Sequence, residues 1–227
     1  MAQFRELTEA DHGRVTRAVA AAEAGTDGEI VTIVTRRSDS YHDVGLHWAV
    51  GVTFLAMSVF AAFPDFYRGL ILRLMGGWEH ELPERTFLTV LLCALIIKFL
   101  ATRYIMAIMP LRMALTPRAT KSRRVRRRAI ALFRAMVQGR TRARTGVLIY
   151  LSLDEHRAEL VADSAINDKV APEIWGEAMA ALIDGVRADD PAGGLESAVQ
   201  RVGAVLALHF PRSADDSNEL PDRLIEL

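Results

Sequence analysis

An uninterrupted apolar run of twenty residues, Val44 to Phe63, most constrains what this chain of 227 residues can fold into. The run contains no Asp, Glu, Lys or Arg, and His47 is its one ionisable side chain. At about 1.5 Å of rise per residue, a helix of this length spans about 30 Å, the thickness of a bilayer's hydrocarbon core. Asp43 and Pro64 bound it sharply. The run therefore predicts a transmembrane helix rather than a buried core helix.

A second apolar segment runs from Thr86 to about Thr102. It is long enough to span if Lys98 extends its ammonium group back to a membrane surface. Residues 65–85 form a short connection between the two segments. This connection is either an ordinary exposed loop or an interfacial segment. The apolar residues that would lie in the interface are Leu70, Ile71, Leu74 and Met75.

A basic stretch follows the second segment. Residues 112–144 hold 12 Lys or Arg and no Asp or Glu, whereas residues 145–227 carry a net charge of −10. The positive-inside rule places such a flank in the cytoplasm, and two spans then place both termini there. We thus expect a protein of the cell inner membrane. The residues expected to bind anionic lipid headgroups are Arg118, Lys121, Arg123, Arg124, Arg126, Arg127 and Arg128.

Nucleic acid is a less favoured partner for the basic stretch. The stretch directly follows a membrane segment and lacks interleaved aromatic residues. The acidic C-terminal part of the same chain is another possible partner for these basic residues. The arginines could also serve only to orient the two spans in the membrane. Anionic lipid is the expected partner.

The remaining segments predict an α/β domain. The β-branched segment Glu29–Thr35 and the apolar segment Thr145–Leu153 predict strands joined through a helix, which favours parallel pairing. Neither side of the membrane hairpin has enough strands for a stable sheet alone, so one domain is expected to assemble from both. Gly193 and Gly194 are expected in a loop. The other predicted elements are helix Leu7–Ala24 capped by Thr8, helix Lys121–Gln138, strand Arg157–Asp163 forming an antiparallel hairpin, helix Pro172–Val186 and helix Leu195–His209.

Four regions follow from this order. Residues 1–43 and 111–210 form the first and second parts of the α/β domain. Residues 44–110 form the transmembrane helical hairpin, and residues 211–227 form an acidic tail that is expected to be mobile.

Several short patterns resemble the TPM domain family, which was named from a thylakoid lumen protein of photosystem II repair and an acetylcholine-receptor modulator. The resemblance covers about residues 5–37 and 120–210, and it is closest to short membrane-anchored bacterial members. The patterns are Thr26-Asp27-Gly28-Glu29-Ile30-Val31, Ala131-Leu132-Phe133 leading into Thr145-Gly146-Val147-Leu148-Ile149, the hairpin through Asp163, and Gly193-Gly194-Leu195.

The resemblance implies an α/β/α sandwich with a small mixed sheet, here interrupted by the transmembrane hairpin. Some members are described as acid phosphatases or calcium-binding proteins that use acidic loop residues. This chain departs from the family pattern at Arg144-Thr145 and at Ser164–Asp168. The resemblance makes a divalent cation such as Ca²⁺ the cofactor to consider, and a solvated acidic rim is the favoured alternative. The candidate ligands are Asp27, Glu29, Asp163 and Asp168.

No residue is assigned a catalytic role. The chain has no phosphate loop or nucleophile elbow, and Ser152 and Ser164 lack a recognisable base in the sequence. We therefore expect a non-catalytic interaction or assembly module on the cytoplasmic face of a bacterial membrane, with a membrane protein or a second copy as partner. The alternatives are a phosphatase-like hydrolase or calcium-binding domain, and a small transporter or channel component. The last has only His47 and Lys98 as polar candidates within the spans.

Overall fold

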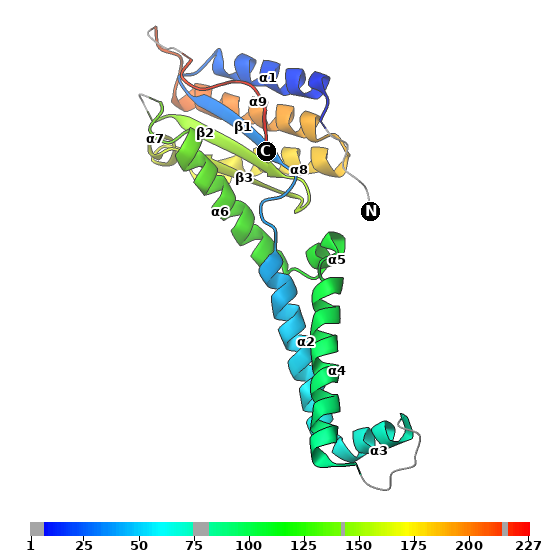
Figure 1. Cartoon of the computed structure of the whole chain (residues 1–227). Helices are drawn as coiled ribbons and strands as arrows, with labels where there is room; N and C mark the ends of the chain where they lie inside the picture. The colour runs from blue at the N-terminus through cyan, green and yellow to red at the C-terminus, as the bar shows by residue number, and fades with distance from the viewer. Residues whose placement is uncertain (1–6, 75–81, 142–143, 215–217) are drawn as a thin grey trace. The chain divides into compact units, whose positions relative to one another are not determined.

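A small mixed sheet is the centre of the α/β domain in the computed structural model (Figure 1). Strands β1 (Glu29–Thr35) and β2 (Gly146–Ser152) pair in parallel over their whole length. β3 (Arg157–Ala162) pairs antiparallel with β2, and β4 (Ile225–Glu226) pairs in parallel with β1, giving the order β3-β2-β1-β4. Every residue of β1 and β2 is buried, which fits their mostly apolar sequences. The predicted parallel pairing and antiparallel hairpin are confirmed.

The structure describes residues 7–74, 82–141, 144–214 and 218–227. It divides into two units. The first consists of residues 1–39 and 118–227 and contains the sheet. The second consists of residues 40–117 and is entirely helical in its regular structure where it is described.

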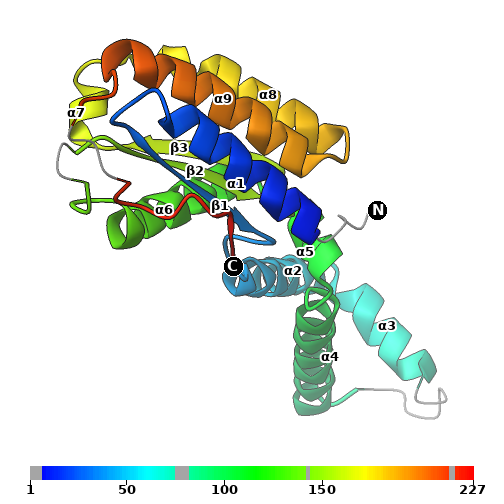
Figure 2. The same cartoon turned by 90° about the horizontal axis from the view of Figure 1, so that it is seen from above.

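Helices cover both faces of the sheet in the first unit (Figure 2). On one face, helix α6 (Arg118–Met136) packs Val125, Ala129 and Phe133 against the sheet. The opposite face carries a larger apolar core that three helices share. The α/β/α sandwich that the family resemblance implies is therefore observed. The helices of the second layer are α1 (Glu9–Glu23), α8 (Gly176–Arg187) and α9 (Pro191–His209), with the short α7 (Ser164–Asn167) and the 3₁₀ turn η1 (Pro172–Trp175) between β3 and α8.

The start of α1 confirms the predicted cap. The Thr8 hydroxyl accepts a hydrogen bond from the Asp11 amide at 3.3 Å, and the Asp11 carboxylate accepts one from the Thr8 amide at 2.8 Å. This reciprocal pair is a capping box, which satisfies backbone donors that a helix leaves open.

The loop predicted at Gly193 and Gly194 is wrong, because both glycines lie within α9. A Cβ atom on Gly194 would lie 2.7 Å from the carbonyl oxygen of Leu182, and one on Gly185 would lie 2.4 Å from the Gly194 Cα. The glycines thus permit the backbones of α8 and α9 to approach closely. Asp190 begins the helix by accepting a hydrogen bond from the Gly193 amide at 2.9 Å.

The prediction of a mobile tail is also wrong for the described residues of 211–227. Leu220 and Leu224 are buried, and Ile225–Glu226 form strand β4. The Leu227 amide donates to the Val34 carbonyl oxygen at 3.0 Å. The tail therefore lies along the otherwise open edge of β1.

The second unit is built on two long helices, α2 (His42–Ala62) and α4 (Glu84–Ile105), that pack against each other. The connection left open by the sequence contains a regular helix, α3 (Pro64–Leu74), and α4 is followed by the short α5 (Met109–Ala114). Met75 lies outside the described residues.

Candidate membrane-anchoring site

The surfaces of α2 and α4 are apolar and open. The two helices have 21 and 22 residues, so they are about 32 and 33 Å long, and both are long and apolar enough to cross a membrane. A core helix of a soluble protein would hide its apolar face. Only 17% of the most apolar 18-residue window of α2 is buried, and 0% of that of α4. Phe54, Leu55 and Ile97 are among the large side chains left exposed.

Four hydroxyl side chains within these helices are satisfied locally. Each donates to the backbone carbonyl oxygen four residues earlier, at 2.8 or 2.9 Å. Such internal bonds are what a lipid environment requires, since no water is present to pair with the hydroxyl group. The donor and acceptor pairs are Thr53 to Ala49, Ser58 to Phe54, Thr89 to Arg85 and Thr102 to Lys98.

A buried arginine joins the two ends of the second unit's hairpin. Arg112 in α5 is 3% exposed. Its Nε donates to the Met106 carbonyl oxygen at 2.7 Å, and its Nη1 donates to the Ser40 carbonyl oxygen at 2.9 Å. Beside it, Tyr41, Val44 and Met113 form a small buried cluster. The chain therefore enters and leaves the hairpin at one end.

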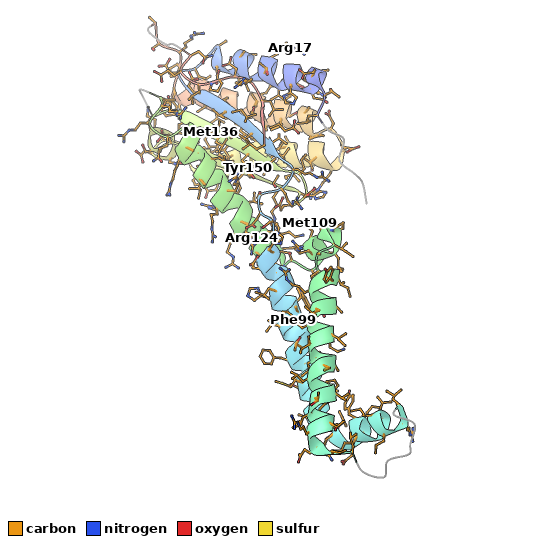
Figure 3. All side chains as sticks on the ribbon, in the orientation of Figure 1. Arg17, Phe99, Met109, Arg124, Met136 and Tyr150 are labelled. Carbon is orange, nitrogen blue, oxygen red and sulfur yellow. The ribbon has the colours of Figure 1, made fainter. Side chains whose placement is uncertain are left out.

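The outer face of α6 is basic. Val125 and Ala129 face the sheet, so the arginines lie on the remaining surface of the helix. Figure 3 shows the side chains of α6, with Arg124 labelled. Arg124 is partly buried and forms an ion pair with Asp39 at 3.1 Å, both within the first unit. Lys121 is half-buried, and burial lowers its pKa against the opposing effect of Glu155. The other residues predicted to bind lipid are exposed: Arg118, Arg123, Arg126, Arg127 and Arg128.

Two of the candidate cation ligands, Asp27 and Glu29, bind the C-terminal segment. The Asp27 carboxylate accepts a hydrogen bond from the Ser213 amide at 2.6 Å. The buried Glu29 accepts from the amides of Glu219 at 3.3 Å and Leu220 at 3.1 Å. These carboxylates hold the C-terminal segment against the start of β1. Each accepts hydrogen bonds that its negative charge strengthens.

The other two candidates lie around the short α7. Asp163 caps this helix by accepting a hydrogen bond from the Ser164 amide at 2.7 Å, and its second carboxylate oxygen is buried without a partner in the described structure. Asp168 ends the helix and is exposed. Within the described residues, no three His, Cys, Asp or Glu side chains gather into a group that could hold a metal ion, so the four predicted ligands are not brought together as a site.

A polar cluster at the carboxyl ends of β1 and β2 has no counterpart in the sequence analysis. Ser38 Oγ lies 2.9 Å from Tyr150 Oη and donates to Ser152 Oγ at 2.9 Å. Ser152 in turn donates to the Glu155 carboxylate, which also accepts from the Ser38 amide at 3.0 Å. Burial raises the pKa of the Tyr150 hydroxyl. The base that Ser152 lacked in the sequence is thus Glu155.

This cluster forms a continuous chain of hydrogen bonds, as a proton relay does. However, a substrate would not reach its buried hydroxyl groups. Ser152 and Tyr150 are 0% exposed, and Glu155 is 5% exposed. No substrate reaches a hydroxyl group that is fully covered. A signal was present in the sequence, because Ser38 follows β1 and Ser152 ends β2, and the carboxyl ends of these neighbouring parallel strands meet at one edge of the sheet.

Comparisons with known proteins agree with this architecture. The model of the TPM domain matches residues 109–205, which include α6, β2, β3, α8 and most of α9. The NMR structure of the BA42 protein from the psychrophilic bacterium Bizionia argentinensis has a TM-score of 0.56 with this chain at 17% sequence identity. That alignment covers 100% of this chain and 99% of the BA42 chain, and at this identity it shows a shared fold alone. The comparison with curated proteins found no match.

Proposed function

Because this chain carries a TPM domain, we propose that it is a membrane-anchored member of that family which acts as a non-catalytic interaction or assembly module. The observation that carries the proposal is the exposed apolar surface of α2 and α4. Burial of this surface in lipid would explain why it is so large and why no other part of the described protein covers it. In a bacterial cell the domain faces the cytoplasm from the inner membrane, which the basic residues of α6 support.

The arginines of α6 supply the lipid contact in this proposal. Each exposed Lys or Arg near an anionic surface adds about 1 kcal/mol of attraction. Arg123, Arg127 and Arg134 are exposed and recur at positions that share one helix face. The same residues would also set the orientation of the spans, so one segment serves both purposes.

The hydrogen bonding and burial of the candidate polar side chains support a non-catalytic role. Asp27 and Glu29 bind backbone amides of the tail, and the hydroxyl groups of Tyr150 and Ser152 are fully buried. An assembly module needs neither group to be accessible. Its partner is a membrane protein or a second copy of the chain.

A proximity measurement tests the lipid contact. A bimane label on Ala131→Cys, an exposed position of α6, is placed in a Cys93→Ser background, and the full chain is incorporated into nanodiscs. We expect brominated phosphatidylglycerol to quench the label more than brominated phosphatidylcholine does, and added salt to reduce the difference. Replacing Arg123, Arg127 and Arg134 with Gln should abolish the preference. Replacing the exposed Arg187 of α8 and Arg201 of α9 with Gln should leave the preference for phosphatidylglycerol unchanged. Equal quenching by both lipids in the parent protein would contradict the proposed contact.

Hydrolysis is tested separately with a generic phosphomonoester, in the presence and absence of Ca²⁺ and Mg²⁺. The proposal predicts no turnover under any of these conditions. Turnover that Glu29→Ala abolishes in a folded variant would replace the assembly role with the hydrolase alternative.

A further inference from the structure

Helix α3 is fixed on one side to the rest of the second unit. Ile71 is buried in a cluster with Leu82 and Phe87. The Arg68 guanidinium lies over the Phe87 ring, 4.8 Å from its centroid, and Tyr67 makes an edge-to-face contact with Phe60 at 4.4 Å. These contacts join α3 to the end of α2 and the start of α4. The helix therefore has a defined orientation in its unit, and it turns away from the two long helices in both views (Figures 1 and 2).

The face of α3 next to the packed residues Tyr67 and Ile71 carries an exposed apolar stripe. Phe66, Leu70 and Leu74 recur every four residues and are 66%, 42% and 78% exposed. This spacing places them on one face of the helix. Asp65 and Gly69, which are also exposed, lie on the neighbouring polar face. The helix is thus amphipathic, and its own unit leaves the apolar stripe exposed.

The described residues of α3 are too few to span a bilayer. Its 11 residues extend about 16 Å, roughly half of a bilayer's hydrocarbon core. A short amphipathic helix joined directly to a transmembrane segment is suited to the interface, where its apolar side enters the boundary between headgroups and acyl chains. Phe63, between α2 and α3, is exposed as well, so the apolar surface of α2 continues into the stripe.

We propose that α3 lies in the plane of the membrane interface, at the end of the hairpin away from Arg112, with Phe66, Leu70 and Leu74 in contact with lipid. The inference rests on the proposed insertion of α2 and α4. The occupant of the stripe is the bilayer, because the stripe is continuous with the lipid-facing surface of α2. Arg73 lies beside the stripe, and its exposed guanidinium can bind a lipid phosphate. An interfacial α3 limits how far the hairpin can move through the membrane.

Depth-dependent quenching tests this placement in the full chain. Phe66→Cys, Leu70→Cys and Leu74→Cys are each made in a Cys93→Ser background, labelled with bimane and reconstituted in phosphatidylcholine–phosphatidylglycerol vesicles. One set of vesicles carries bromine near the headgroups and another near the bilayer centre. Leu70 and Leu74 lie outside the buried cluster of α3, so their variants remain informative if Phe66→Cys perturbs the aromatic contacts.

All three labels should be quenched more strongly by the shallow bromines, at one common depth of about 5–10 Å. Gly69→Cys is the matched control, since a Cβ atom there meets nothing within 4 Å, and its label should respond to aqueous iodide instead. If α3 instead continued along the membrane normal, depth would change by about 6 Å between successive labels, and the inference would be wrong.

Two other results would also overturn it. Iodide quenching at all three positions would place the stripe in water. Disulfide formation between copies of the Leu70→Cys variant, with no bromine quenching, would identify a second copy as the occupant. Leu55→Cys, exposed near the middle of α2, separates the two proposals. The label on Leu55→Cys should be quenched by the deep bromines. If it is not, the proposed membrane insertion of α2 and α4 is wrong, and so is the placement of α3 that depends on it.

Discussion

Arg112 Nη1 donates a hydrogen bond to the carbonyl oxygen of Ser40 across 2.9 Å, joining residues 72 positions apart in the sequence. Ser40 is where the chain enters the helical unit, and Arg112 lies in its last helix. The bond therefore closes the hairpin at its base. An arginine suits this position because its planar group can bind two carbonyl oxygens at once, which a lysine ammonium does with less defined geometry.

Replacing this arginine should loosen the hairpin. Hydrogen bonds from a charged group contribute about 1.5–3 kcal/mol each, and Arg112→Leu removes the bonds to the carbonyl oxygens of Met106 and Ser40. We expect a loss of roughly 2 kcal/mol or more, which would lower the unfolding temperature in detergent by about 4–8 °C. Circular dichroism during heating measures this loss. Arg123→Leu, at an exposed position, is the control, and equal effects of the two changes would contradict the role given to Arg112.

Glu29→Gln should weaken the attachment of the C-terminal segment. The substitution removes the charge that strengthens the bonds to the Glu219 and Leu220 amides, a loss of about 1–2 kcal/mol. Hydrogen exchange at the Leu220 and Leu227 amides should accelerate. Asp168→Asn, at an exposed position, should leave both rates unchanged. A Ca²⁺-dependent rise in unfolding temperature that Glu29→Gln removes would instead support a cation site.

Gly194→Ala should destabilise the packing of α8 against α9. The new methyl group would lie 2.7 Å from the Leu182 carbonyl oxygen, so the helices must separate, at a cost of about 1–3 kcal/mol. Gly176→Ala is the matched control, because a Cβ atom there meets nothing within 4 Å. That change should stabilise the helix by about 0.5–1 kcal/mol, since alanine loses less conformational freedom on folding. Denaturant midpoints of the two variants should therefore move in opposite directions.

Glu159 should make stability fall as pH rises. Burial raises the pKa of this carboxyl group, and Arg126 and Arg157 oppose the shift. Folding then favours the protonated form, so its contribution is complete below the unfolded pKa of about 4 and is lost as pH rises through the folded value. Glu159→Gln should raise the unfolding temperature at neutral pH and lose this advantage in acid. The exposed Glu173→Gln should show no such trend, and a gain from Glu159→Gln that is largest in acid would contradict the assigned shift.

Local sequence signals predicted the regular elements well, because the causes of those elements are local. The cap formed by Thr8 and Asp11 lies within one helical turn, and β1 is identified by its β-branched residues. The loop prediction at Gly193 and Gly194 was wrong for a physical reason. Glycine marks both turns and close backbone contacts, and only the position of α8 distinguishes them.

Partners distant in the sequence were the part that could not be predicted. Arg112 was one of 12 basic residues in its stretch, and nothing local marks it as the one that is buried. Nothing local reveals that Glu29 accepts a hydrogen bond from the amide of Leu220, 191 residues away. Strand β4 has two residues, too few for any periodic pattern to reveal.

The central claim is that the hairpin crosses a membrane with the α/β domain on the cytoplasmic side. Gly69→Cys on the polar face of α3 and Leu208→Cys on the exposed surface of α9 test it directly, each in a Cys93→Ser background in intact bacterial cells. A membrane-impermeant maleimide should label Gly69→Cys from outside, and should label Leu208→Cys only after the cells are permeabilised. Labelling of Leu208→Cys in intact cells would reverse the orientation, and labelling of neither position until permeabilisation would contradict a hairpin that spans the membrane.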